Sequence, residues 1–403
     1  MKPVQRIREY PAALVRQAQK SLTLAADWAV RNQIRDAWPA WDANKGRFPY
    51  HILIDPAKRA KQPQMWSTCW KTARAAQGLY SAYLVTRKPA YLAAANLAME
   101  YVATLQVFEP GCEESYGSFR EDSPQGLHIA SRDGMEAVQG FIAGYQVTRN
   151  PRFLRRAIAG TDFLLRTMKN GKWPFGIAWP LEGKFKSQDS FCFYAGALVF
   201  AQMFALTKNR AYLTRGAIPF ADRILAHYVR ADGALGIVAG SELSHHVGRT
   251  GELAGVFIND DGIGVALLAA YAVTGDKRYR EAAVGFADFW TGITEQPGKL
   301  AAYPSVALLL ADVYRLTGDR KYLPCIVEFV QKTISLQYLS PKNPFLHGCF
   351  IGEDMATHYD KKTCSMDYVD LRITSYALIA LAKIAAKRAD QWGCSYSCYG
   401  RRR

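Results

Sequence analysis

Two groups of carboxylates have residue types and spacing suited to acid–base chemistry. Asp133 and Glu136 are three positions apart, and Asp260 and Asp261 are adjacent. Residues three apart in a helix share one face, so we expect Asp133 and Glu136 side by side. Two carboxyls can serve as the acid and base of glycoside cleavage, and their separation sets the stereochemical outcome. The alternative for Asp133 and Glu136 is a pair that caps a helix.

A second set of residues suits a lyase. His245 and His246 stand before Asp260, and His358 and Tyr359 stand before Arg372. A lyase neutralises the carboxylate of a uronate and removes the neighbouring C5 proton, which requires a base such as His246 or Tyr359. The alternative for each histidine is an ordinary surface position. The arginines expected to hold an acidic group are Arg132, Arg249 and Arg372.

Aromatic residues accompany these polar residues. A pyranose ring has apolar faces that can stack on an aromatic ring, although packing in the core is the other common use of such residues. The segment 173–179 carries a tryptophan at each end and shows no helical periodicity, which favours stacking. The residues expected to contact substrate in this way are Trp66, Trp70, Trp173, Trp179 and Tyr194, with His245 and His358 beside them.

A repeated joint indicates the elements that must position these residues. A threonine ends an apolar run, and an aromatic residue follows five positions later. Between them, Gly275 and Gly318 suit the left-handed residue that ends a helix, and Pro89 and Pro151 suit the first turn of the next one. Each joint predicts helix, tight turn and helix, with the aromatic packed back onto the first helix. The pairs are Thr86–Tyr91, Thr148–Phe153, Thr207–Tyr212, Thr274–Tyr279 and Thr317–Tyr322.

The helices on the two sides of a joint differ in character. Those before it are apolar nearly all round and are expected to be buried, whereas those after it carry Arg and Lys on one face. Predicted inner helices span 68–86, 133–148, 188–206, 260–274, 303–317 and 368–386. Predicted outer helices span 12–32, 90–106, 151–169, 210–229, 277–292 and 320–337. This alternation predicts an all-α (α/α)6 toroid, with a helical solenoid as the alternative.

Long loops precede the predicted inner helices, and several begin with glycine and an aromatic residue that indicate short strands or hairpins. They span 34–67, 107–132, 170–187, 230–259 and 338–367. All of them lead from an outer to an inner helix, so they lie on one rim of the ring. Long loops gathered on one face of a rigid scaffold usually carry function. We therefore expect the site on this rim and the tight joints on the other.

The composition narrows the possible partners. The chain of 403 residues has a net charge of +16 and is 49% hydrophobic, which suits one domain spanning 1–403. The charge favours an anionic partner. We expect an acidic oligosaccharide or polysaccharide rather than nucleic acid, because the basic residues form no long block. No run is long enough to span a bilayer, so no membrane partner is expected.

The N-terminus lacks a signal-peptide core, so the chain as written is expected in the cytoplasm, or in the periplasm or outside the cell if a signal has been replaced. The eight cysteines show no paired CxxC motifs, so we expect buried thiols and neither a metal nor a cofactor. The sequence leaves the oligomeric state open.

The chain resembles the (α/α)6-barrel carbohydrate enzymes. The resemblance rests on the Thr-Gly-Asp-x-x-Tyr joints, on the aspartate pair at a predicted inner-helix start, and on the final helix from Ser375 to Ala382. It covers most of the chain, and the most similar families are the unsaturated uronyl hydrolases and their neighbours among the toroidal polysaccharide lyases and sugar epimerases. In the uronyl hydrolases an aspartate at an inner-helix start hydrates the unsaturated ring. The resemblance implies that role for Asp133 or for Asp260 and Asp261.

Together these features predict a glycan-cleaving enzyme, a glycoside hydrolase of the uronyl hydrolase type that acts on an acidic sugar. A polysaccharide lyase that uses the His, Tyr and Arg residues is one alternative, and a non-catalytic helical-repeat binding protein is another. A terpene-type enzyme on a related ring needs an aspartate-rich diphosphate site, for which Asp260 and Asp261 alone are too few.

Overall fold

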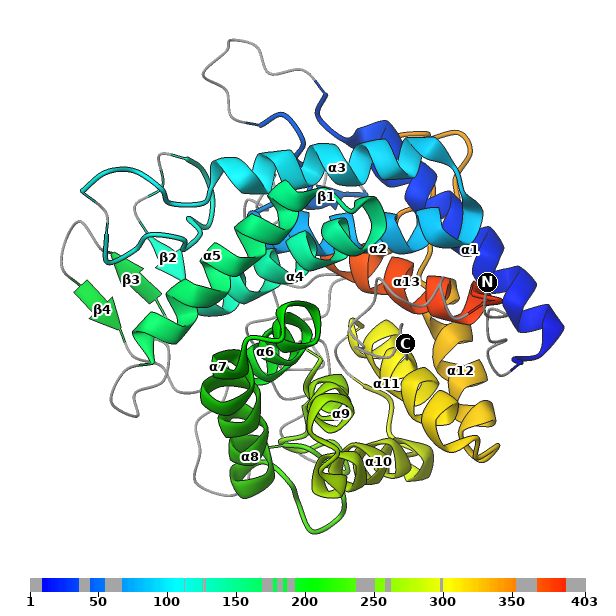
Figure 1. Ribbon diagram of the computed structural model, residues 1–403. Helices are drawn as coiled ribbons and strands as arrows, with labels where there is room; N and C mark the ends of the chain where they lie inside the picture. Colours follow the sequence, from blue (N-terminus) through cyan, green and yellow to red (C-terminus); the bar gives the residue numbers. More distant parts are fainter. Residues whose placement is uncertain are drawn as a thin grey trace, which may run out of the picture.

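A closed ring of helical hairpins makes up the computed structural model (Figure 1). The structure describes residues 9–35, 44–54, 67–111, 113–124, 126, 128–168, 177–179, 184–186, 193–236, 251–257, 262–297, 300–352 and 368–388. The predicted (α/α)6 toroid is confirmed, and the solenoid alternative is wrong. None of the described helices is long and apolar enough to cross a bilayer.

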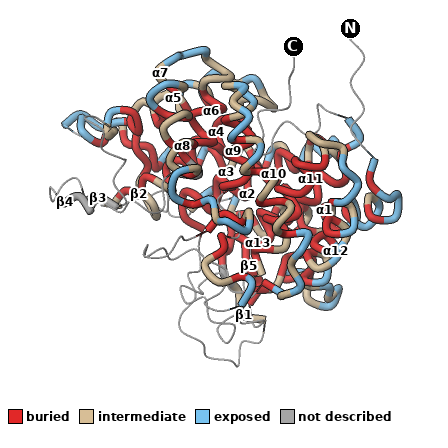
Figure 2. Tube along the Cα trace, turned by 90° about the horizontal axis from the view of Figure 1, so that it is seen from below, coloured by how far each residue is buried: buried red, intermediate tan, exposed pale blue. Residues whose placement is uncertain are grey.

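The inner helices begin and end within a few residues of their predicted bounds. They are α2 (Cys69–Thr86), α4 (Ser131–Thr148), α6 (Phe193–Thr207), α9 (Ile263–Thr274), α11 (Ala302–Thr317) and α13 (Leu371–Ala385). Buried residues predominate along them, while exposed residues concentrate on the outer helices and connections (Figure 2). The lack of a solvent-facing polar surface on these helices is therefore explained by contacts on every side, and the polar residues of α2 and α4 face the interior of the ring.

The outer helices also match the prediction, with one interruption. They are α1 (Ala12–Asn32), α3 (Pro89–Thr104), α5 (Pro151–Thr167), α7 (Arg210–Tyr212) with α8 (Ile218–His227), α10 (Lys277–Gly292) and α12 (Tyr322–Ser335). A π-helical segment, Leu213–Ala217, joins α7 to α8. Gly216 lies there so close to Phe200 that a side chain would collide with the ring.

Each joint is built around its threonine. The Thr274 hydroxyl donates to the Ala270 carbonyl at 2.7 Å and accepts from the Asp276 amide at 3.1 Å. The same two bonds recur at Thr86, Thr148, Thr207 and Thr317. Gly275 and Gly318 take the predicted left-handed conformation, with φ of 78° and 73°. At the other three joints the left-handed residue is Arg87, Arg149 or Lys208.

The aromatic residue of each joint stabilises the packing of the helices, and four of the five connect two hairpins. Phe153 packs back onto Phe141 of α4, as predicted, with the ring centroids 5.9 Å apart. The four tyrosines also donate from their hydroxyls to an aspartate of another outer helix, at 2.6–2.8 Å. The pairs are Tyr91–Asp27, Tyr212–Asp162, Tyr279–Asp222 and Tyr322–Asp288.

Three of the long loops are each held in place by the hydrogen bonds of a buried glutamine. The Gln106 amide donates at 3.0 Å to the Gly117 carbonyl of its own loop and at 3.0 Å to the Arg156 carbonyl of α5. Gln33 and Gln337 make the equivalent bonds. Gly117 has a φ of 90°, and a Cβ there would lie 2.4 Å from the Ala159 carbonyl oxygen, so only glycine fits.

Chain segments from the two ends of the sequence close the ring. Strand β1 (His51–Leu53) pairs antiparallel with β5 (Tyr368–Asp370), and Gln337 donates to the Ser21 carbonyl of α1 at 3.0 Å. A second small sheet has the strand order β2 (Ile129–Ala130), β3 (Ile177–Trp179) and β4 (Lys184–Lys186). Strand β2 leads directly into α4. The loops therefore contain short strands, as predicted.

Candidate active site

Three inner helices begin side by side on the loop rim. Helix α2 packs against both α4 and α13, and backbone bonds hold their first turns to the loops. The Cys69 amide donates to the Glu121 carbonyl at 2.8 Å, and the Leu371 amide donates to the Tyr50 carbonyl at 3.0 Å. The Asp370 side chain caps α13. This frame carries Trp70, Arg132, Asp133 and Arg372 together, although they are up to about 300 positions apart in the sequence.

Trp70 is the centre of a cationic cluster. The guanidinium carbons of Arg132 and Arg372 lie 4.7 and 5.4 Å from the centroid of its ring. The Lys71 ammonium lies 5.1 Å from the same ring and 3.6 Å from the centroid of Tyr50. Burial lowers the pKa of Arg372, and the charge of Arg132 lowers it further. An anion placed here would relieve the repulsion between these cations.

Asp133 lies beside this cluster and is 7% exposed. Its Oδ1 atom accepts a hydrogen bond from Arg132 Nη1 at 3.2 Å. Helix α4 begins at Ser131 after the N-cap residue Ala130, so Asp133 is the third residue of the helix and not its cap. The capping alternative is therefore wrong. The positive end of the helix dipole and the adjacent guanidinium both favour a carboxylate at this position.

Glu136 lies one turn further along α4 and pairs with Arg74 of α2. Both side chains are wholly excluded from solvent. The Arg74 Nη1 atom also donates to the side-chain oxygens of Gln77 at 3.4 Å and of Gln139 at 3.3 Å. This polar layer lies directly beneath the arginine cluster, because its residues follow Trp70 and Asp133 by one to two helical turns.

The loop that precedes α4 contributes residues that the sequence did not single out. Glu121 Oε2 lies 2.8 Å from His128 Nε2. Burial raises the pKa of Asp122, and the charge of Glu121 raises it further. Burial also raises the pKa of the Cys69 thiol, to which the charges of Asp133 and Glu121 add. The carboxylates of Glu121, Asp122 and Asp133 therefore lie near the start of α2. The only feature of the sequence that could have indicated Glu121 and Asp122 is that two acidic residues are adjacent in this loop.

Several predicted site residues lie outside the described residues. They are Trp66, Trp173, His245, His246, Arg249, Asp260, Asp261, His358 and Tyr359. Of Trp179 in β3 and Tyr194 in α6, only the backbone is described. The structure therefore brings together Trp70, Arg132, Asp133, Glu136 and Arg372 from the predicted set.

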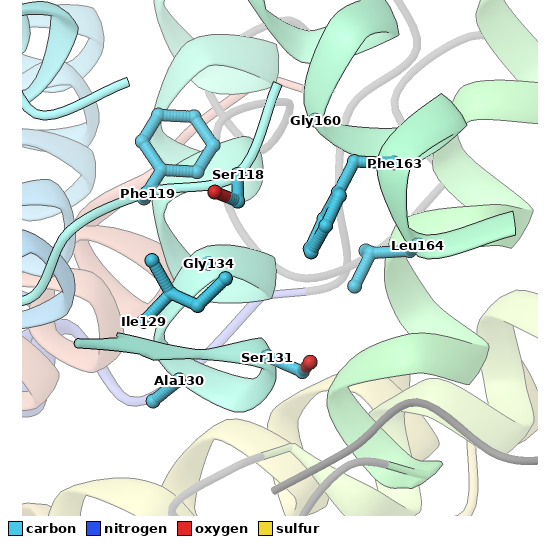
Figure 3. Close-up of a pocket in the computed structure, with 9 residues that line it drawn as sticks. All are labelled: Ser118, Phe119, Ile129, Ala130, Ser131, Gly134, Gly160, Phe163 and Leu164. Atoms are coloured by element: carbon cyan, nitrogen blue, oxygen red, sulfur yellow. The ribbon is translucent and has the colours of Figure 1, made fainter. Parts of the chain in front are cut away.

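A small cavity lies behind the start of α4 (Figure 3). Its volume is about 10 Å³, which is room for one water molecule. The wall contains the hydroxyls of Ser118 and Ser131 together with Phe119 and Phe163. It is too small for a sugar ring, so it belongs to the packing that supports the site.

No family model matches the sequence, and no curated protein matches it. Solved structures match the fold over nearly the whole chain. A sugar epimerase from a ruminal bacterium matches with a TM-score of 0.68 and 11% identity, over 93% of this chain and 99% of that chain. A family 76 glycoside hydrolase (mannosidase) from Bacteroides thetaiotaomicron matches with a TM-score of 0.64 and 12% identity, over 93% and 98%.

A third match is an inactive variant of an α-1,6-mannanase from Salegentibacter sp., in complex with α-1,6-mannotetrose. Two consecutive aspartates are replaced by alanine in that variant. The TM-score is 0.59 and the identity 12%, over 91% of this chain and 98% of that chain. At these identities the likeness establishes the fold. The chain has the (α/α)6 toroid fold that these carbohydrate-active enzymes share.

Proposed function

We propose that the protein is a glycoside hydrolase that acts on an acidic, uronate-containing oligosaccharide or polysaccharide. The observation that carries this proposal is the position of Asp133 beside the arginine cluster around Trp70. The arginines would bind the uronate carboxylate through charge-assisted hydrogen bonds. Trp70 would position both guanidinium groups, because they lie over its ring.

Asp133 would take the proton from the water that adds to the sugar. The guanidinium of Arg132 favours the ionised form of the neighbouring carboxyl group, and an ionised carboxylate suits a base better than an acid. The fold supports a reaction on a glycan, since matching toroids include a mannosidase and a mannanase. The uronyl hydrolase type remains our choice because that reaction hydrates an unsaturated uronate with an aspartate at an inner-helix start.

The second carboxyl, the acid that would donate a proton to the double bond as the water adds, would come from Asp260 or Asp261, which directly precede the N-cap residue of α9. They are the only consecutive aspartates in the chain. The inactive mannanase variant lacks two consecutive aspartates, and this parallel supports the assignment.

We propose that residues 1–403 form one catalytic domain.

The test is a screen of oligosaccharides that end in an unsaturated uronate, followed by ultraviolet absorbance. Hydrolysis removes the conjugated double bond, so the absorbance should fall on incubation with the protein. A rise in absorbance on intact uronate polysaccharides would instead identify a lyase, with His246 and Tyr359 as the residues to change. No change with any uronate glycan would contradict both readings.

A further inference from the structure

Beneath the arginine cluster lies a buried polar layer with unmatched hydrogen-bonding atoms. It consists of Gln77 on α2 with Glu136 and Gln139 on α4, all 0–2% exposed. Among the residues that the structure describes, none pairs with Gln77 Nε2, Gln139 Nε2 or Glu136 Oε1. Buried polar atoms are rarely left without partners, so a concentration of three on two facing helices indicates a ligand.

Arg74 determines which way these groups point. Its Nη1 atom donates to the amide oxygens of both glutamines, and Nη2 donates to Glu136 Oε2. Flipping either amide would turn its NH2 group toward the guanidinium, where donor would face donor. The two NH2 groups and the second carboxylate oxygen therefore point away from Arg74.

This set of atoms selects the chemistry of the ligand. It offers four N–H donors and one anionic acceptor, whereas a carboxylate or phosphate would be repelled by Glu136. A metal ion would meet the amide donors, and an apolar group would leave all of them unmatched. Hydroxyl groups both donate and accept, so adjacent hydroxyls of one ring satisfy the whole set.

We propose that Gln77, Gln139 and Glu136 form the floor of the sugar site and bind vicinal hydroxyls of a single pyranose ring. The ring would direct its hydroxyls to this floor and its carboxylate to Arg132 and Arg372, one to two helical turns above. This inference rests on the proposed function, from which it takes the assumption that the ligand is a sugar. It adds recognition of the neutral part of the sugar, which the arginine cluster does not provide.

The experiment measures monosaccharide binding by calorimetry, with glucose, galactose and mannose and their three uronates as probes. The variants are Gln139→Met and Gln77→Met, which keep side-chain length and remove the amide, and Arg372→Met. Gln106→Met is the matched control, because Gln106 is equally buried but has its amide bonded to two backbone carbonyls. We expect each floor variant to raise Kd at least tenfold for neutral sugars and uronates alike, with a loss of Tm smaller than that of the control, because Arg74 loses one long hydrogen bond but keeps its pair with Glu136.

The control should show the opposite pattern, a lower Tm and unchanged Kd. Arg372→Met should weaken only the uronates. If the floor variants keep wild-type Kd, the layer holds only water and the inference is overturned, even if uronates still bind better than neutral sugars. If neutral sugars and uronates bind alike and both depend on the floor, the inference stands and the acidic specificity of the proposed function fails. Failure of the wild-type protein to bind any of the six sugars also overturns the inference.

Discussion

Arg74 of α2 and Glu136 of α4 form an ion pair in which both side chains are 0% exposed. The two helices belong to different hairpins, so this pair joins neighbouring parts of the inner ring directly beneath the candidate site. A buried charge without its partner is costly, since it keeps its desolvation penalty and loses the attraction that offset it.

Replacing Glu136 with leucine should therefore lower the free energy of unfolding by about 3–5 kcal/mol, the usual cost of breaking a buried pair. Urea unfolding monitored by circular dichroism would measure it. The double variant Arg74→Met, Glu136→Leu should recover most of the loss, because no charge is left unpaired. Glu100→Gln, which breaks an exposed pair with Arg152, should change little. A Glu136→Leu protein as stable as wild type would show that the pair contributes nothing.

The acid–base assignment is tested by Asp133→Asn. Asparagine keeps the shape and can hydrogen-bond to Arg132, but it cannot accept the proton of the attacking water. Turnover of a uronate glycan should fall by roughly a hundredfold or more, the scale of a lost general base, with little loss of Tm. The same change at Asp260 and at Asp261 should identify the partner carboxyl. A variant that melts early yet keeps its turnover would assign Asp133 a structural role.

The arginine cluster predicts a dependence on charge and salt. Arg372→Met should weaken uronate binding by about 10- to 100-fold, the equivalent of one hydrogen bond to a charged group. Rising salt should weaken wild-type binding of uronates and leave neutral sugars unaffected, because mobile ions screen the attraction. Calorimetric titrations of the protein with uronates and with neutral sugars at two ionic strengths would measure this dependence. Salt-independent activity on acidic and neutral glycans alike would contradict the cluster's role.

The left-handed residues of the joints give a matched pair of stability tests. Gly275→Ala places a side chain at a φ of 78° and should cost about 1–2 kcal/mol. Arg149→Gly at the equivalent position of another joint relieves that strain, but it removes the guanidinium that lies 5.6 Å from the Tyr145 ring. Its effect should be smaller than that of Gly275→Ala. Thermal unfolding of both variants would check the order, and the reverse order would refute this account of the joints.

Asp122 predicts a pH dependence of stability. The pKa of Asp122 in the folded protein is raised above the ordinary value of 3.8. Between the unfolded and the folded pKa, the folded state therefore binds more protons than the unfolded state. Stability contributed by this group is present in acid and is lost as the pH rises through the folded pKa. Asp122→Asn should therefore gain stability relative to wild type between acid and neutral pH. Unfolding free energies that change in parallel for the two proteins would contradict the assignment.

The sequence alone determined the toroid, because its signals are local. A threonine with a left-handed residue after it, and a helix apolar on every side, need only their own neighbours to be interpreted. Gly46 and Gly117, each followed two positions later by an aromatic residue, likewise indicated the start of a loop, and close approach of an outer helix excludes a side chain at both positions. The interpretation of Asp133 and Glu136 as a capping pair failed, because the partner of Glu136 is Arg74, on another helix.

Only the tertiary structure decided how the site is assembled. Trp70, Arg132 and Arg372 meet because α2, α4 and α13 are neighbours in a ring that closes between its first and last hairpins. The surroundings of Lys71, Gln77 and Gln139 could not be predicted either, since each looks like an ordinary polar residue in a helix until its neighbours are known. The contact between Trp70 and Arg372, which are about 300 positions apart, depends on ring closure, and no local pattern encodes which helix starts will face one another.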